Sequence, residues 1–384
     1  MEPDPHYNFR DVLWAPARAL SAKQILSMTI FLLAAIVAYD LFAYIAFAID
    51  GQSLSTTFSV YGFFPMVWLT FGSLIARIVY WVGCGLAVFS VMLGFFTVAA
   101  FNIEAIRGNH FLTTRQAIRF ALCRAKHIFL AEVAIVLFVA FIVLLFFLLG
   151  LVSRLPVVGE WIYTVLFVIP NFIIALFSIF IIFVFTLTVL LLPITAAADR
   201  VGETFTAILE TFSTIIRQPF RWLGYTLYSF VAAKVCGFIY AYFCYRAVQF
   251  MAWSASLGGG DRLQDLVKSG LAHLPVRSDI IRETFSLLPW FDFGVSLNQW
   301  VLPGSRSAAS HFMAFMLFLI FASIIGYMLA IIAAAQARGY VALRYIKDEY
   351  RVADEDPLFF TDEHVNPKVE EGERPHTRAD DSAG

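Results

Sequence analysis

Residues 128–152 read IFLAEVAIVLFVAFIVLLFFLLGLV, and Glu132 is the only ionisable side chain in this stretch. A helix needs about 20 apolar residues to cross the hydrocarbon core of a bilayer. Inside lipid, every backbone N–H and C=O group must find a partner within the protein, which a helix provides. The stretch therefore predicts a transmembrane helix.

Further apolar runs of similar length predict the same structure elsewhere, so we expect an all-α fold: a polytopic membrane helical bundle. The predicted spans are 25–49, 78–102, 128–152, 171–197, 224–249 and 312–336. Composition agrees, because 60% of the 384 residues are hydrophobic and 14% are charged, against about 25% charged residues in soluble domains. The net charge of -1 provides no overall field to attract nucleic acid, so no nucleic-acid partner is expected.

Three regions follow from this pattern. Residues 1–24 are expected to form a cytoplasmic interfacial helix, and residues 25–351 the six-span membrane domain. The domain includes a long extracytoplasmic helical loop, 251–310, which we expect to cover the bundle as a lid. The tail, 352–384, is rich in Asp, Glu and Pro and poor in apolar residues. That composition predicts disorder.

The distribution of lysine and arginine predicts the orientation. The segment between the second and third spans carries Arg107, Arg115, Arg119, Arg124 and Lys126, whereas residues 51–73 contain neither lysine nor arginine. Cytoplasmic loops carry the excess of basic residues. Both termini are therefore expected in the cytoplasm, with the chain in a bacterial inner membrane.

An amphipathic segment precedes each odd-numbered span, at residues 11–24, 113–127 and 202–220. We expect interfacial elbow helices there, with the apolar face in the acyl boundary. Arg115, Arg119 and Lys126 form a basic stripe on the second and are candidate contacts for anionic lipid. The elbows either sense lipid or anchor the tilt of the spans.

Proline predicts a break before the fourth span. Pro170, in VIPNF, lacks a backbone donor and disfavours helix in the preceding residue. A short interfacial segment before Pro170 is expected, followed by the span.

Residues 103–230 resemble a group of prokaryotic six-span membrane proteins. An apolar-Pro-x-x-Gly turn precedes one span, and the next span ends in proline before an acidic-x-x-Gly elbow; the matching positions are Pro156, Gly159, Pro193, Asp199, Gly202, Ala207 and Ile208. The group includes the membrane domain of glycerophosphodiester phosphodiesterases and its standalone relatives. The sequence shows no phosphodiesterase domain, so the resemblance implies the fold and not that activity.

Ionisable residues inside spans are costly and are functional candidates by default. They are Asp40, Glu132 and Lys234, the last within YSFVAAKVCGFIYAY at 228–242. Lys234 can extend toward the interface or pair with Asp40, whose depth in the first span is similar. The alternative is a role for Asp40 and Lys234 in transport or proton relay.

Small residues recur every four positions in the sixth span, at Ala322, Gly326, Ala330 and Ala334. Such a stripe lets helix backbones approach closely. We expect packing within one chain, and the alternative is a homodimer or another protein partner.

No cofactor or metal is expected. The four cysteines, Cys84, Cys123, Cys236 and Cys244, form no CxxC pair, and phosphate-loop, HExxH, GxSxG and GxGxxG patterns do not occur. These observations favour a non-enzymatic envelope protein that organises membrane lipid or a partner complex. A transporter for a small or amphipathic solute, using Asp40 and Lys234, is the alternative. A membrane-embedded enzyme is the third hypothesis.

Overall fold

The protein is described by a computed structural model that covers residues 5–63, 65, 71–152, 158–199, 204–276, 278–288, 291–292 and 302–358. The predicted all-α fold is confirmed. Within those ranges the only strands, β1 (Ser286–Leu288) and β2 (Phe291–Asp292), form one antiparallel pair.

Six long helices dominate: α3 (Ala22–Ile49), α5 (Leu74–Ile106), α6 (Thr114–Val152), α8 (Val168–Ala198), α10 (Pro219–Gly259) and α13 (Ser305–Asp348). All but α8 are, over their described residues, long and apolar enough to cross a membrane. In α8 the corresponding apolar part is shorter, Val168–Val184. These helices make the chain a membrane protein by length and composition, and the count of six spans stays a prediction.

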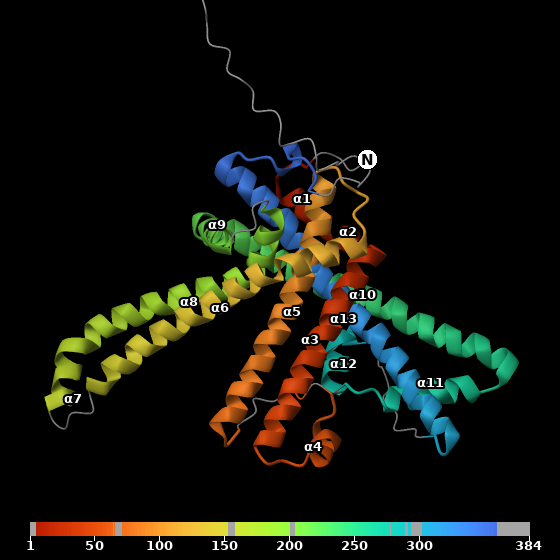
Figure 1. The fold of residues 1–384 in the computed structure, drawn as a ribbon. Helices are drawn as coiled ribbons and strands as arrows, with labels where there is room; N and C mark the ends of the chain where they lie inside the picture. Colours follow the sequence, from red (N-terminus) through yellow and green to blue (C-terminus); the bar gives the residue numbers. More distant parts are fainter. Residues whose placement is uncertain are drawn as a thin grey trace, which may run out of the picture.

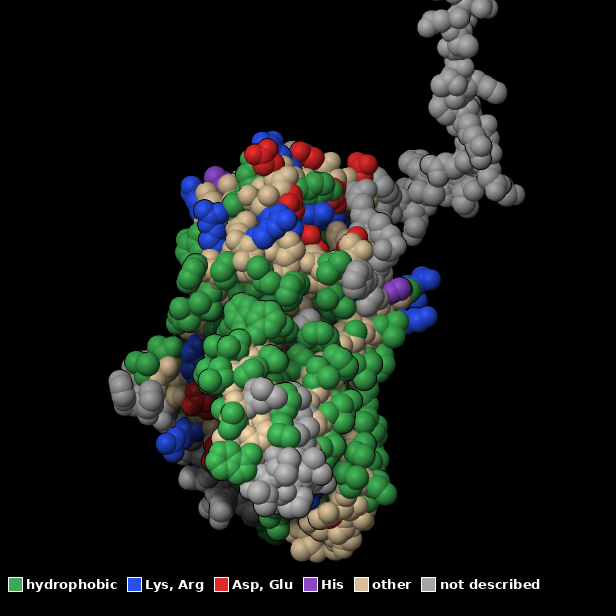
Figure 2. All heavy atoms as spheres, turned by 90° about the vertical axis from the view of Figure 1, so that its left-hand side faces the viewer, with side chains coloured by type: hydrophobic (Ala, Val, Ile, Leu, Met, Phe, Trp, Pro, Cys, Tyr) green, Lys and Arg blue, Asp and Glu red, His purple; other side chains and the backbone are tan. Residues whose placement is uncertain are grey.

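The long helices form three hairpins, α3–α5, α6–α8 and α10–α13, which meet at one end and spread apart toward the other (Figure 1). Short helices cover the end where they meet: α1 (Phe9–Leu13), α2 (Ala15–Ala19), α9 (Thr204–Arg217) and the 3-10 turn η2 (Val352–Asp354). We call this end the hub; it comprises residues 7–21, 92–112, 190–199, 204–217 and 327–358. Figure 2 shows charged side chains crowded at the hub end, with hydrophobic side chains over the middle of the molecule.

Helix α5 lies at the centre and packs against α3, α6, α8 and α13. Its close approach to α3 depends on two glycines. A Cβ on Gly83 would lie 2.4 Å from the Cβ of Phe42, and one on Gly94 would lie 2.8 Å from the sulfur of Met28. The small-residue stripe of α13 makes a similar contact, because a Cβ on Gly326 would lie 2.3 Å from the Oγ1 of Thr29 on α3. Ala322, Ala330 and Ala334 are buried with it.

The hub end of α5 is closed by a glycine. Gly108 has a φ of +90°, a conformation that glycine adopts without cost. Its N–H donates to the carbonyl oxygen of Ala105, and the N–H of Asn109 donates to that of Glu104 at 2.8 Å. This is the hydrogen-bond pattern of a Schellman motif. The helix therefore ends at Ile106, with Arg107 as its C-cap residue.

The predicted elbows differ from one another. The first is the pair α1 and α2, and the third is α9, a separate helix. The second has no boundary, because α6 runs without interruption from Thr114 to Val152. No glycine or proline lies between residues 114 and 149, so nothing ends the helix before it becomes the span. An interfacial position for these segments stays a prediction.

The short segment predicted before Pro170 is present as α7, and a π-helical turn joins it to α8. Helix α7 (Val158–Ile162), a π-helical turn at Tyr163–Phe167 and α8 follow each other directly. A π turn widens the helix and changes its bonding from i→i+4 to i→i+5. Pro170 is the third residue of α8, in the first turn, where backbone N–H groups have no partner within the helix, so its missing N–H does not end α8.

The tail differs from prediction at its start. Residues 352–358, expected to be disordered, are ordered against the hub: Val352 is fully buried, and the N–H of Leu358 donates to the Glu104 carboxylate at 3.1 Å. Val352 supplies a buried apolar side chain, whereas the contact of Leu358 comes from its backbone N–H. Residues 359–384 lie outside the described ranges.

The predicted loop 251–310 is partly helical. Helix α10 extends ten residues past its predicted end and stops at Gly259, before Gly260 at φ +66°. Helix α11 (Arg262–Ala272) then packs against α10 and α13, and α12 (Ser278–Thr284) follows. The remainder of the segment, 277, 289–290 and 293–301, is not among the described residues.

Candidate functional site

The three ionisable residues predicted within spans lie apart in the fold, on α3, α6 and α10. Asp40 is buried on α3, with 8% of its surface exposed. Glu132 is half-buried on α6, and its Oε2 atom has no hydrogen-bond partner in the described part of the chain. They form no common site.

Lys234 contacts a carboxylate that the sequence argument had not considered. Its Nζ lies 2.8 Å from the Oε1 of Glu283 and donates to the Glu283 carbonyl oxygen, also at 2.8 Å. Glu283 belongs to α12, in the segment predicted as an outer lid. Lys234 therefore attaches α12 to the middle of α10, whereas Asp40 was the partner suggested by depth.

Helix α12 separates two cavities. The first, which we call the α11 pocket, has a volume of about 360 Å³ between α10, α11, α12 and α13. It is lined by Cys244, Tyr245, Val248, Gln249, Ala252, Trp253, Gln264, Val267, Lys268, Leu271, Leu274, Ile281, Phe285, Leu317, Ile320, Phe321 and Ile324. Its size falls within the range of about 300–1,000 Å³ typical of small-molecule sites.

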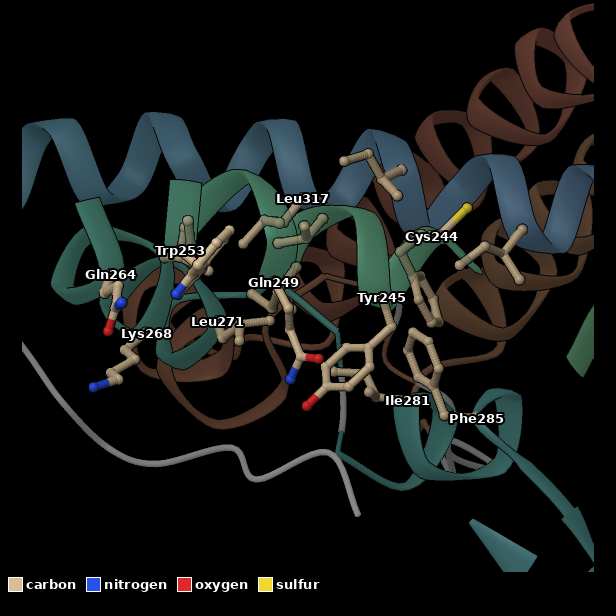
Figure 3. A pocket seen from close by; sticks show the side chains of 17 residues that line it. Cys244, Tyr245, Gln249, Trp253, Gln264, Lys268, Leu271, Ile281, Phe285 and Leu317 are labelled. Atoms are coloured by element: carbon tan, nitrogen blue, oxygen red, sulfur yellow. The ribbon is translucent and has the colours of Figure 1, made fainter. Parts of the chain in front are cut away.

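The α11 pocket is amphipathic. Figure 3 shows the polar ends of Tyr245 and Gln249 pointing in the same direction, away from α13, while Gln264 and Lys268 lie together at another edge. Leu271 and Leu317 lie among the apolar side chains of the wall. Lys268 is exposed, and the described residues that line the pocket include no acidic side chain. The pocket fits an apolar chain that ends in a polar or anionic group.

The second cavity, which we call the inter-hairpin cavity, lies between the α3–α5 hairpin, α13 and the segment before α12. Its volume is about 600 Å³, and all of the described residues that line it are apolar: Leu32, Ala35, Ile36, Phe63, Ala87, Val88, Val91, Met92, Phe95, Leu190, Pro275, Val276, Ile280, Phe318, Phe321, Ala322 and Ile325. A solvated polar substrate would lose its hydration there without replacement. The cavity fits an acyl chain.

The two cavities share their wall. Ile280 lines the inter-hairpin cavity, the next residue, Ile281, lines the α11 pocket, and Phe321 of α13 lines both. Glu283, which holds Lys234, is two residues further along α12. Lys234 thus acts on both cavities through the position of α12. The transporter hypothesis requires a cavity lined by Asp40 or Lys234. Neither residue lines either of these two cavities.

The basic stripe of α6 remains on the surface. Arg115, Arg119 and Lys126 are all exposed, in the part of α6 that begins beside the hub (Figure 1). They are placed to meet headgroup phosphates if that end lies in the interface, and nothing in the fold covers them.

Sequence reasoning overlooked the role of Arg107, which we counted only as a basic loop residue. Its guanidinium donates to Glu104 Oε1 at 3.0 Å, to the carbonyl oxygen of Ala198 at 3.0 Å and to the carboxylate of Glu355. These partners belong to α5, to α8 and to the segment after α13. One buried side chain therefore connects all three hairpins. The Glu104–Arg107 spacing of three residues was the only signal in the sequence.

Comparison with known proteins gives no relative from which to infer a function: no family model, no curated protein and no solved structure matches the chain. The resemblance to the membrane domain of glycerophosphodiester phosphodiesterases stays a prediction. Among the described residues no group of three or more His, Cys, Asp and Glu side chains is suited to hold a metal ion.

Proposed function

We propose that this protein organises lipid in a bacterial inner membrane, without catalysis, by holding apolar chains in the spaces between its hairpins. The observation that carries the proposal is the apolar character of all the described residues that line the inter-hairpin cavity. In a bilayer such a space fills with the surrounding hydrocarbon, since an apolar cavity is costly when empty and excludes water.

The α11 pocket supports the same function. Its apolar wall can contact an acyl chain, and Lys268 at its edge can bind an anionic headgroup. Both spaces border α12, so the attachment of α12 through Lys234 and Glu283 sets the shape of each. We infer that Lys234 positions the lipid-binding wall and does not carry a solute.

The proposed orientation places the hub and both termini on the cytoplasmic side. Basic residues near the hub, including the exposed Arg115, Arg119 and Lys126, then face anionic headgroups. Each such residue near the surface contributes about 1 kcal/mol of attraction. Helices α11 and α12 then lie toward the outer side, in keeping with the predicted lid.

The test changes the cavity wall and leaves the surface alone. Ala35 lines the inter-hairpin cavity and is 4% exposed, whereas its neighbour Ala34 is on the exposed face of α3. Ala35→Phe fills the cavity, and Ala34→Phe adds the same group outside it. Native mass spectrometry of protein released from nanodiscs should show that Ala35→Phe loses bound phospholipid while Ala34→Phe keeps it.

Equal phospholipid retention in both folded variants would contradict the proposal. If proteoliposomes containing the protein also released an enclosed solute, the transporter hypothesis would replace it. A protein that copurifies with the chain and depends on the same wall would instead favour the partner-complex hypothesis.

A further inference from the structure

A third cavity, which we call the hub pocket, lies at the opposite end of the molecule from the α11 pocket. It has a volume of about 470 Å³ and is bounded by α1, α2, the turn after α5 and α13. Among the described residues, it shares no lining residue with the α11 pocket or with the inter-hairpin cavity. Its chemistry is also different, because its lining is rich in cationic side chains.

Three arginines from three helices line the hub pocket: Arg10 on α1, Arg18 on α2 and Arg338 on α13. Arg338 is 7% exposed and belongs to the buried side of the pocket. Arg10 and Arg18 are exposed and belong to its rim. The guanidinium groups thus approach one space from separate elements that the hub holds in place.

The remaining ionisable side chains leave the pocket cationic. Asp11 is the only acidic residue among the described lining residues, and its Oδ1 lies 3.6 Å from Nδ1 of His6. His110 lines the pocket from the turn after α5. Among the described lining residues, three arginines and one aspartate give an excess of two positive charges, even with both histidines neutral.

We propose that the hub pocket binds a phosphate group, carried either by a phospholipid headgroup or by a small soluble phosphate ester. Arginine presents a planar fork of N–H donors that matches phosphate oxygens in pairs. A carboxylate has two oxygens and accepts one such fork, whereas a phosphate accepts several. The residues that support this proposal lie outside the α11 pocket and the inter-hairpin cavity, so it does not rest on the proposed function.

The position of the hub pocket allows either a phospholipid headgroup or a soluble phosphate ester to reach it. Trp14, which also lines it, is 59% exposed, and tryptophan is enriched where a membrane meets water. A phospholipid headgroup reaches the rim from that interface, and a soluble ester reaches it from the adjoining solution. Both present the same oxygens to the arginines.

The experiment uses the full chain and two double variants of equal net charge. Arg10→Gln with Arg18→Gln removes the two rim arginines, and Arg262→Gln with Arg282→Gln removes two exposed arginines of α11 and α12, outside the hub pocket. Binding of glycerol 3-phosphate and inorganic phosphate is measured by calorimetry in a neutral detergent. Binding of phosphatidic acid is measured in nanodiscs with and without that lipid.

The rim variant should bind its probe at least roughly tenfold more weakly than the wild type, and the Arg262→Gln, Arg282→Gln variant within about twofold of it. Binding of the soluble probes in detergent assigns the pocket to a soluble ester, and binding confined to nanodiscs with phosphatidic acid assigns it to a headgroup. Equal weakening in both variants, or a folded wild type that binds none of the probes, overturns the proposal. Unfolding midpoints confirm that each variant is folded.

Discussion

Helices α5 and α6 both carry an apolar run long enough to cross a membrane, and they differ in what surrounds that run. In α5, which contributes to the hub, 61% of the most apolar 18-residue window is buried, whereas in α6 the share is 17%. The hub is stabilised by protein contacts and buried polar bonds. The hairpin depends on lipid to cover its exposed phenylalanines and leucines. Hydrophobic sequence alone therefore does not distinguish a protein core from a lipid-facing surface.

The strongest test of this comparison is Arg107→Met. The change leaves the carboxylates of Glu104 and Glu355 in the hub without their common partner, and the Arg107 and Glu104 side chains are 0% and 2% exposed. Breaking a buried ion pair in this way costs about 3–5 kcal/mol. Unfolding by SDS in mixed micelles should show this loss.

Arg119→Met is the matched control, since Arg119 is exposed on α6. It should change the free energy of unfolding by about 0.5 kcal/mol or less. Similar losses in the two variants would show that the Arg107 contacts do not stabilise the hub.

A second test compares two leucines on one helix, α8. Leu191 is fully buried in the hub, and Leu176 is 61% exposed in the hairpin. Leu191→Ala removes buried atoms and leaves a cavity, at a cost of about 2–5 kcal/mol. Leu176→Ala changes a lipid-facing surface and should cost about 0.5 kcal/mol or less. Equal costs, measured by the same SDS titration, would mean that the hairpin is packed against protein.

The smallest expected effect belongs to Lys234→Met. The Lys234 and Glu283 side chains are 30% and 78% exposed, so their ion pair contributes at most about 1 kcal/mol. Hydrogen exchange should become faster in residues 278–288, because α12 loses its attachment, and should not change in residues 92–107.

Faster exchange throughout the hub would contradict the local role of Lys234. Lys268→Met is the matched control, since it removes another exposed lysine near α12 without touching Glu283. Its exchange in residues 278–288 should match that of the wild type.

The sequence was sufficient to predict the helices, because each span carries its own signal in 20 or so consecutive residues. It was not sufficient for the contacts that organise them. Arg107 meets Ala198 and Glu355 across separations of 91 and 248 residues, and nothing in the local pattern encodes either pairing. The hub could therefore not be foreseen from periodicity.

The candidate site shows a similar division. The sequence pattern identified Lys234 as a residue that needs a partner. A charge inside an apolar span is costly to desolvate, and this can be recognised from the sequence of one helix. It did not identify Glu283, because that residue was assigned to an outer lid and excluded from the search for partners at the depth of Lys234. The α11 pocket and the inter-hairpin cavity likewise depend on how the hairpins diverge. The residues within a single span do not specify that divergence.

The bonds of Arg107 also set the order in which the protein can mature. Its partner Glu355 lies beyond α13, so all six long helices have been synthesised before that carboxylate exists. Until then, the hairpins already inserted by the translocation machinery lack one of the three partners through which Arg107 connects them. A chain terminated after Asp348 would retain every long helix and lack the residue that completes their joining.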